Sequence, residues 1–139
     1  MKEAKVIGGG TVVDDRGSVS FVNEFDFGGV KRFYQVENHR RDFIRAWHGH
    51  KHEGKYVYVS QGSALIGVVN LDTQKIEKFV LSSKTPKILW IPPGHANGFK
   101  NLEENTKIIF YSTSTLEESM DDDIRFEYDK WNIWDEEYR

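Results

Sequence analysis

Short segments of alternating apolar and polar residues recur along almost the whole chain, and they restrict it to a β-rich fold. Clusters of Gly, Asn, Asp, Ser or Pro separate these segments, as turns separate strands. Many short strands at close spacing predict a β-sandwich or a β-barrel. The segments include VSFVNEF (19–25), KRFYQVEN (31–38), KYVYVSQ (55–61), SALIGVVNL (63–71) and KIIFYSTS (107–114).

The chain is expected to fold as one domain over residues 1–139. Its 139 residues, 38% of them hydrophobic, suffice for a single core, and no repeat or linker divides the sequence. A short helical segment is expected near residues 114–123, where Ser114 or Thr115 can cap a turn that carries acidic residues near its positive end. The aromatic stretch 124–139 is expected to pack on the body of the protein or on another subunit.

Charge and residue usage exclude several classes of protein. The net charge of −3 gives no general attraction to nucleic acid or to an anionic membrane. The chain contains no cysteine, which excludes disulfides, cysteine-ligated zinc and thiol catalysis. No apolar run approaches the roughly 18 residues of a membrane span, and the N-terminus lacks the apolar core of a signal peptide. We therefore expect a cytoplasmic protein with neither nucleic-acid nor membrane partners.

The stretch RAWHGHKHEGKYVYVSQG (45–62) concentrates the ionisable residues of a candidate site. His48 and His50 lie two positions apart, so a strand would point both to the same face, as many metal sites require. The stretch resembles the metal-binding motif of cupins, all-β jelly-roll barrels also called double-stranded β-helices. However, Lys55 stands at the place of the ligand glutamate, and Asn97 stands at the place of the third histidine. An ammonium has no lone pair and an amide is a poor ligand, so no metal is expected.

A histidine beside a lysine suits a different chemistry, the abstraction of a proton from carbon next to a carbonyl. The histidine removes the C–H proton, and the lysine stabilises the enolate oxygen that forms. The lysine charge also lowers the tendency of the histidine to be protonated. A tyrosine on another strand would return a proton from the opposite face, and the result would be epimerisation.

Six motifs along the chain resemble those of the dTDP-4-dehydrorhamnose 3,5-epimerase family, whose members are RmlC-like cupins. The resemblance implies a jelly-roll barrel with a short C-terminal helical segment, and a cofactor-independent isomerase. It also implies a nucleotide-diphosphate sugar, linked to dTDP, as substrate, and a homodimer. The motifs are DDRGS (14–18), QVEN (35–38), IRAWHGH (44–50), GKYVYVSQG (54–62), LWIPPGHANGF (89–99) and FYSTS (110–114).

The resemblance also assigns roles to individual residues. It implies that His48 is the base, Lys55 the enolate stabiliser and Tyr111 the acid, and that a C-terminal aspartate orients the histidine. Asp129 is the nearest candidate for that aspartate, although an ungapped alignment places Tyr128 there. The residues implied to bind substrate are Arg16, reaching in from a neighbouring subunit, Gln35, Asn38, Arg45, His50, His95 and Asn97.

Other functions fit parts of the same sequence. RAWHGHK (45–51) also resembles the motif of the short dTDP-sugar 3,4-ketoisomerases, which use paired histidines beside a 4-keto group. We favour the epimerase, because Lys55 and Tyr111 are the residues that protonation from the opposite face requires. A metal-dependent cupin with irregular ligands such as Glu53 or His95, and a non-catalytic sugar-binding cupin, remain as further hypotheses.

Overall fold

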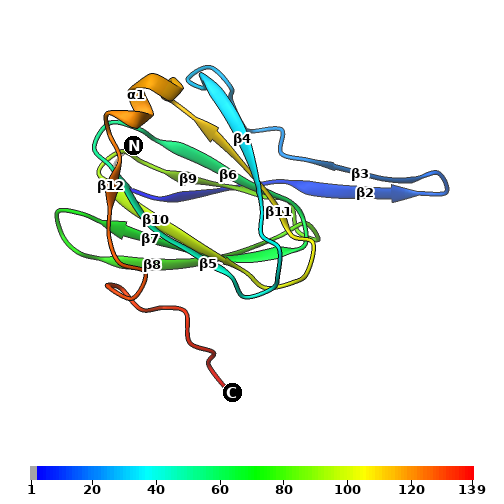
Figure 1. The fold of residues 1–139 in the computed structure, drawn as a ribbon. Helices are drawn as coiled ribbons and strands as arrows, with labels where there is room; N and C mark the ends of the chain where they lie inside the picture. The colour runs from blue at the N-terminus through cyan, green and yellow to red at the C-terminus, as the bar shows by residue number, and fades with distance from the viewer. Residues whose placement is uncertain (1–2) are drawn as a thin grey trace.

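The computed structural model describes residues 3–139 as two antiparallel β-sheets that face each other (Figure 1). The first sheet has the order β1 (Lys5–Gly8), β9 (Lys87–Ile91), β6 (Lys55–Gln61), β11 (Lys107–Ser112) and β4 (Arg32–Glu37). The second sheet has the order β12 (Ile124–Arg125), β5 (Ile44–His50), β10 (His95–Asn101), β7 (Ser63–Asn70) and β8 (Ile76–Ser82). The expected all-β jelly-roll is thus confirmed.

The alternation that predicted strands also determines which side chains enter the core. In β6, Val57 and Val59 are buried between the sheets, whereas Tyr56 and Tyr58 point to the outer face. Burying one such apolar side chain stabilises the fold by roughly 1.5–3 kcal/mol. The same apolar core also contains Ala64, Ile66, Val68, Leu81, Leu89, Ile91, Phe99, Ile108 and Phe110.

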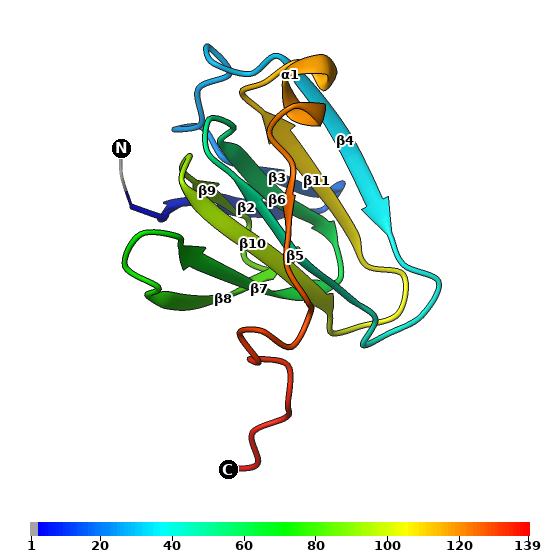
Figure 2. The same cartoon turned by 60° about the vertical axis from the view of Figure 1, so that its left-hand side comes forward.

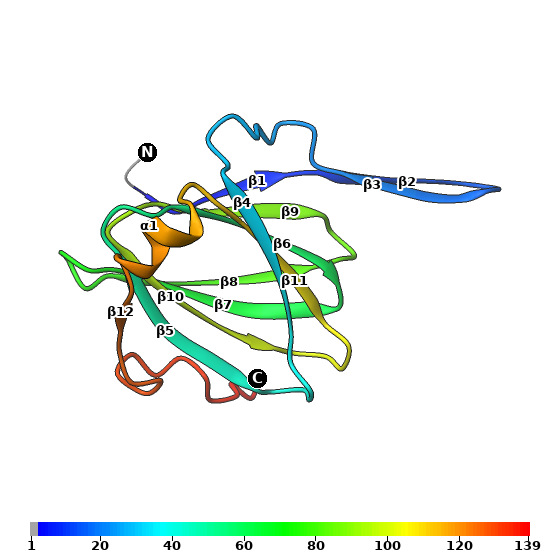
Figure 3. The same ribbon diagram turned by 45° about the horizontal axis from the view of Figure 1, so that its top comes forward.

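A two-stranded hairpin extends from the body of the molecule (Figures 1 and 3). It consists of β2 (Gly10–Asp14) and β3 (Gly17–Phe21), which pair with each other and with no strand of the two larger sheets among residues 3–139. Val12, Val13 and Val19 are each more than half exposed on it. An isolated two-stranded hairpin is only marginally stable in water, and this one keeps these apolar side chains exposed.

The aromatic C-terminal stretch packs on the outside of the second sheet, which is one of the two locations expected for it. Trp131 and Trp134 are buried against Trp47 of β5. The indole N–H groups of Trp47 and Trp134 both donate to the carbonyl oxygen of Tyr128, at 3.0 and 2.9 Å. Figure 2 shows this segment descending from β12 past the lower ends of β5 and β10. Trp47 therefore faces away from the space between the sheets.

One short helix, α1 (Leu116–Met120), lies over one end of the two sheets (Figure 1). Thr115 caps it, because the Thr115 hydroxyl accepts from the Glu118 N–H while the Glu118 carboxylate accepts from the Thr115 N–H. The predicted helical segment is confirmed, with Thr115 rather than Ser114 as the cap. In the part of the chain that the structure describes, no helix has the length and apolar character needed to cross a bilayer.

Candidate active site

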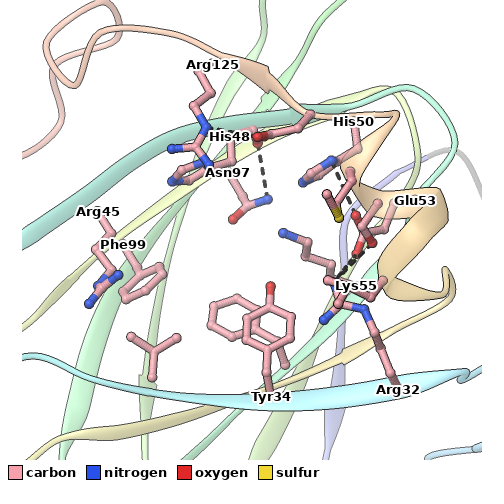
Figure 4. Close-up of a pocket in the computed structure, with 16 residues that line it drawn as sticks. Arg32, Tyr34, Arg45, His48, His50, Glu53, Lys55, Asn97, Phe99 and Arg125 are labelled. Carbon is pink, nitrogen blue, oxygen red and sulfur yellow. Dashed lines mark hydrogen bonds and ion pairs between the residues drawn. The ribbon is translucent and has the colours of Figure 1, made fainter.

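A cavity of about 300 Å³ opens between the two sheets, at the end covered by α1. The second sheet contributes His48, His50 and Asn97, and the first sheet contributes Lys55 and Tyr34. Figure 4 shows these side chains pointing into one common space. The cavity therefore lies between two walls that carry different chemical groups.

A bulge in β5 brings a third residue of this strand into the cavity. Opposite β5, Asn97 of β10 pairs with His48, and Phe99 pairs with Arg45. Three residue steps on β5 thus match two on β10, so β5 contains one extra residue between these pairs. Arg45 and His48 can face the same cavity for that reason, although strict alternation would place them on opposite faces.

His48 is half-buried and favours its neutral form. Burial lowers the pKa of its imidazole, and the positive charges of Lys55 and Arg125 lower it further. A neutral imidazole beside a cation can accept a proton, as a general base must. The amide of Asn97 donates to the backbone oxygen of His48 at 3.4 Å, which ties the two strands together at this point.

His50 is buried, and its contacts determine which of its ring nitrogens is free. Nδ1 lies 2.7 Å from the carbonyl oxygen of Asp122 and 3.4 Å from Oε1 of Glu53. Both of these atoms are acceptors, so Nδ1 carries the proton and Nε2 keeps its lone pair. Nε2 is buried without a hydrogen-bond partner among residues 3–139. Burial and the charge of Lys55 lower the pKa of this histidine too.

Lys55 begins β6 and is buried, with 7% of its surface exposed. Its ammonium nitrogen lies 5.9 Å from the ring centre of Tyr34 and 5.8 Å from that of Phe110. Burial lowers the pKa of Lys55, and the carboxylate of Glu53 opposes that effect. Lys55 thus supplies a partly desolvated cation in the middle of the cavity, where developing negative charge is stabilised most strongly.

The structure does not place Tyr111 in this cavity. Tyr111 lies on the outer face of β11, where its ring packs against Phe25, Phe27 and Phe33 with centre-to-centre distances of 5.3, 5.4 and 6.4 Å. Together with Tyr56 of the same face, these residues form what we call the outer aromatic cluster. Tyr111 faces outward because its neighbour Phe110 faces the core, and successive residues of a strand alternate.

Tyr34 of β4 takes the position inside the cavity that was expected of Tyr111. It pairs with Phe110 in the register of the first sheet and stacks on it at 5.0 Å. Burial raises the pKa of its phenol, and the negative charge of Glu53 raises it further. A neutral phenol is a proton donor, so Tyr34 has the chemical form of a general acid. The alternation in KRFYQVEN (31–38) could have indicated this position of Tyr34, because Arg32, Tyr34 and Val36 share one face of the strand.

Arg45 and Arg125 place two cations at the margin of the cavity (Figure 4). The guanidinium of Arg45 donates from Nε to the side-chain oxygen of Asn38 at 2.6 Å. Asn38 in turn donates to Asn101 at 3.1 Å. Asn38 therefore acts on the orientation of Arg45 in this structure, although the resemblance assigned it to the nucleotide. Planar guanidinium groups in such a position suit bidentate contact with phosphate oxygens.

Four other expected site residues lie away from this cavity. Arg16 sits in the turn of the β2–β3 hairpin and pairs with Asp14 at 2.6 Å. Gln35 points to the exposed face of β4, opposite to Tyr34. Asp129 borders a separate surface hollow next to Trp134. His95 is buried, with Nδ1 at 3.1 Å from the carbonyl oxygens of Pro92 and Pro93, and does not line the cavity.

Glu53 is the site residue whose contacts the sequence did not indicate. Only 2% of its surface is exposed, and it borders the cavity beside His50, Lys55 and Arg32. Nothing in the local sequence marks it as buried, because it lies in the loop between β5 and β6. Within residues 3–139, no group of three His, Asp or Glu side chains is arranged to hold a metal ion.

The fold defines an RmlC-like cupin, and a cavity lined by ionisable side chains lies between its two sheets. The family model described as dTDP-4-dehydrorhamnose 3,5-epimerase matches residues 1–137, so the chain belongs to this family of isomerases. A search among curated proteins finds no significant match.

Solved structures of two enzyme types share this fold. A dTDP-4-dehydrorhamnose 3,5-epimerase from Sulfolobus tokodaii is 25% identical, with a TM-score of 0.77 over 94% of this chain and 81% of that one. A 3,4-ketoisomerase from Helicobacter canadensis is 20% identical, with a TM-score of 0.72 over 94% and 95% of the two chains. The Mycobacterium tuberculosis RmlC epimerase is 19% identical, with a TM-score of 0.71. The match covers 81% of this chain and 64% of the length of that epimerase.

Proposed function

We propose that this protein epimerises a nucleotide-diphospho-4-keto-6-deoxy sugar at C3, at C5 or at both. The observation that carries the proposal is the division of groups between the two walls of the cavity. The histidines come from the second sheet, whereas Lys55 and Tyr34 come from the first sheet. A sugar ring held between the walls would have a base on one face and an acid on the other.

The proposed reaction is a balanced pair of proton transfers. His48 takes the proton from the carbon next to the C4 carbonyl, and the electron pair of that C–H bond moves toward the carbonyl oxygen. Lys55 stabilises the resulting enolate by charge and hydrogen bonding. Tyr34 then gives its phenolic proton to the same carbon from the opposite face, and the C4 carbonyl re-forms. Solvent returns a proton to Tyr34, and His48 releases the one it accepted.

The proposed chemistry assigns the stabilising charge to Lys55, so it needs no metal ion. Lys55 occupies the place at which the cupin metal motif has a glutamate ligand. We further propose that Arg45 and Arg125 contact the diphosphate of the substrate, since both border the cavity. A dTDP-linked sugar is the favoured substrate, because a related Bacillus anthracis epimerase binds TDP and pyrophosphate.

We also infer that the functional unit is a homodimer. The β2–β3 hairpin exposes Val12, Val13 and Val19, and the outer aromatic cluster exposes Phe27 and Phe33. Covering these side chains would remove apolar surface from water, and a second copy of the chain is the partner expected from the family resemblance. The hairpin would then carry Arg16 toward the cavity of the partner, since Arg16 lies at its turn.

A 3,4-ketoisomerase is the second candidate, and a specific observation favours it. Within the described residues 3–139, Nε2 of His50 has no hydrogen-bond partner, and His50 lines the cavity two residues from His48 on the same strand. Two neighbouring imidazoles can serve two neighbouring carbons, as the movement of a carbonyl from C4 to C3 requires. Because Tyr111 lies outside the cavity, it no longer supports the epimerase as the acid of the reaction. Tyr34 lies inside the cavity and supports the epimerase in that role instead.

One experiment separates the two reactions. The protein is incubated in deuterated water with a panel of dTDP-linked 4-keto-6-deoxy sugars, and the products are identified by NMR. Epimerisation predicts deuterium at an inverted C3 or C5, with the carbonyl still at C4. A carbonyl at C3 would favour the ketoisomerase instead. Binding without deuterium incorporation or carbonyl movement, for every sugar of the panel, would contradict both and favour a non-catalytic sugar-binding cupin.

A further inference from the structure

Glu53 is a buried carboxylate that the mechanism above does not use. It lies in the loop between β5 and β6, and its surroundings come from three other parts of the fold. Oε2 accepts a hydrogen bond from the hydroxyl of Ser112 and lies 3.8 Å from a guanidinium nitrogen of Arg32. A buried charge is costly unless it is paired and hydrogen-bonded, and these contacts account for one of its two oxygens.

The second oxygen lies against His50, which lines the cavity. Oε1 lies 3.4 Å from Nδ1 of His50, is buried, and has no hydrogen-bond partner in the described part of the chain. His50 donates its Nδ1 proton at 2.7 Å to the carbonyl oxygen of Asp122. Oε1 therefore adjoins the imidazole at a distance where it exerts a strong charge effect without replacing the existing hydrogen bond. Figure 4 shows Glu53 beside His50 on the side away from Asn97.

The other charges around His50 leave Glu53 as its main source of negative charge. Lys55, Arg32 and Arg125 border the cavity as cations, and His48 is the neighbouring imidazole. Three aspartates, Asp121 to Asp123, follow α1 in the chain; Asp123 borders the cavity, and the carbonyl oxygen of Asp122 contacts His50.

The carboxylates of Asp122 and Asp123 already have partners in the structure. The Asp122 side chain accepts from the backbone N–H groups of Lys51, His52 and Glu53, at 2.8, 2.8 and 3.0 Å. Asp123 accepts from the guanidinium of Arg125 at 3.0 Å. Among residues 3–139, Glu53 is thus the buried carboxylate with an uncommitted oxygen next to His50.

We propose that Glu53 is a positioning residue that makes His50 a second proton acceptor of the site, by stabilising the imidazolium formed when Nε2 takes a proton. The same carboxylate favours the ammonium form of Lys55, which has to carry positive charge to stabilise the enolate. Without Glu53, a protonated His50 would face Lys55 without its largest compensating negative charge. The inference rests on the proposed function, and it applies to the epimerase and to the ketoisomerase alike.

The direct test is an NMR titration of His50 in protein labelled with ¹⁵N-histidine, which needs no substrate. In the unsubstituted protein, Nδ1 is expected to carry the proton when the ring is neutral. Replacing Glu53 by glutamine, E53Q, is expected to lower the pKa of His50 by about one unit, which means a tenfold lower affinity of the imidazole for its proton. The matched control is E37Q on β4, an exposed carboxylate 3.9 Å from Lys107, which is expected to leave the titration unchanged.

Steady-state kinetics then test the role in turnover. E53Q is expected to lower kcat by about tenfold or more, to change KM by less than about threefold, and to move the acidic limb of the kcat profile to lower pH. E53D, which keeps the charge, is expected to recover part of kcat. A variant that only lost stability would keep the acidic limb of its kcat–pH profile at the same pH.

The outcomes are separable. An unchanged or raised pKa of His50 in folded E53Q would overturn the inference, whatever the activity. If E53Q does not fold, E53D takes its place in the titration, and a pKa of His50 that does not fall with the retracted carboxylate would overturn the inference. An unsubstituted protein that converts no sugar of the panel would contradict the proposed function, while the titration would still decide the role of Glu53.

Discussion

The two faces of the first sheet carry tyrosines of similar sequence context and different surroundings. On the inner face, Tyr34 lies beside Lys55 and Glu53 in a cavity with charged walls. On the outer face, Tyr111 packs among Phe25, Phe27 and Phe33. The two residues belong to neighbouring strands that pair with each other. Tyr34 lies opposite Phe110, one residue before Tyr111, so the two tyrosines face opposite sides of the sheet. The surroundings of a tyrosine, and not its presence in a motif, determine whether it can transfer a proton.

The largest expected effect comes from removing the cation of the inner face. Replacing Lys55 by glutamine should lower kcat by roughly 100- to 1000-fold, because the enolate oxygen loses its main stabilising group. Steady-state assays with the substrate identified by NMR measure this effect. The control is K107Q, at a half-buried position of β11 that does not line the cavity. A K55Q enzyme with more than a tenth of the original kcat would contradict the proposed role.

The comparison of the two tyrosines is tested by replacing each with phenylalanine. Y34F should reduce epimerisation by roughly 100-fold, the lower end of the range for a general acid. Y111F should change kcat by less than about threefold, because its hydroxyl does not reach the cavity. In deuterated water, Y34F should still exchange a substrate proton at the base while inverting little. The opposite ranking of the two variants would show that the outer tyrosine is the acid.

The pH dependence should reflect the lowered pKa values of the two histidines. A base has to be neutral, so activity is lost as the pH falls through the pKa of the histidine. Burial and the charge of Lys55 lower that pKa from its usual value of about 6.5, so the acidic limb is expected below pH 6.5. Removing the charge with K55Q should move the limb to higher pH. A limb that moves to lower pH in this variant would contradict the assignment.

The smallest expected effect concerns the exposed apolar surfaces outside the cavity. V13D on the hairpin should weaken dimerisation, because it places a charge on a surface that the proposed dimer buries. Sedimentation measurements would show a shift toward monomer. If Arg16 reaches the partner's cavity, KM should rise several-fold while kcat changes little. A V13D protein that stays dimeric with unchanged KM would argue against the hairpin as the contact.

The strands and half of the site were predictable, because both follow from local alternation. The period of two predicted β4, β6, β7 and β11, and a strand through residues 48–50 gave His48 and His50 a common face. Lys55 was identified by its place in the cupin motif and lies on the opposite sheet. Motif resemblance misplaced Tyr111, because it compares positions along the chain and carries no information on which face a residue occupies. The parity of the same strands would have pointed to Tyr34, since Phe110 is the apolar neighbour that belongs in the core.

Other features depended on contacts between distant segments. The bulge that brings Arg45 into the cavity arises from pairing with β10 and leaves no mark in the sequence of β5. Glu53 is buried because Ser112 and Arg32, about 59 and 21 positions away in the chain, converge on it. Asp129 was expected near the histidine, but the Trp131 and Trp134 cluster holds that segment on the far side of the second sheet.

The carboxylate of Asp122 accepts hydrogen bonds from three consecutive backbone N–H groups, and this constrains the length of the loop in related proteins. These bonds fix the loop that joins β5 to β6 at a set length, since one inserted residue would displace at least one of the donors. A homologue with a longer connection here has to orient its second histidine by other means. A gap in an alignment between His50 and Lys55 therefore serves as a marker of subfamily. Sequences that keep the spacing between His50 and Lys55 and an aspartate at the position of Asp122 should have the same arrangement of charges around the second histidine.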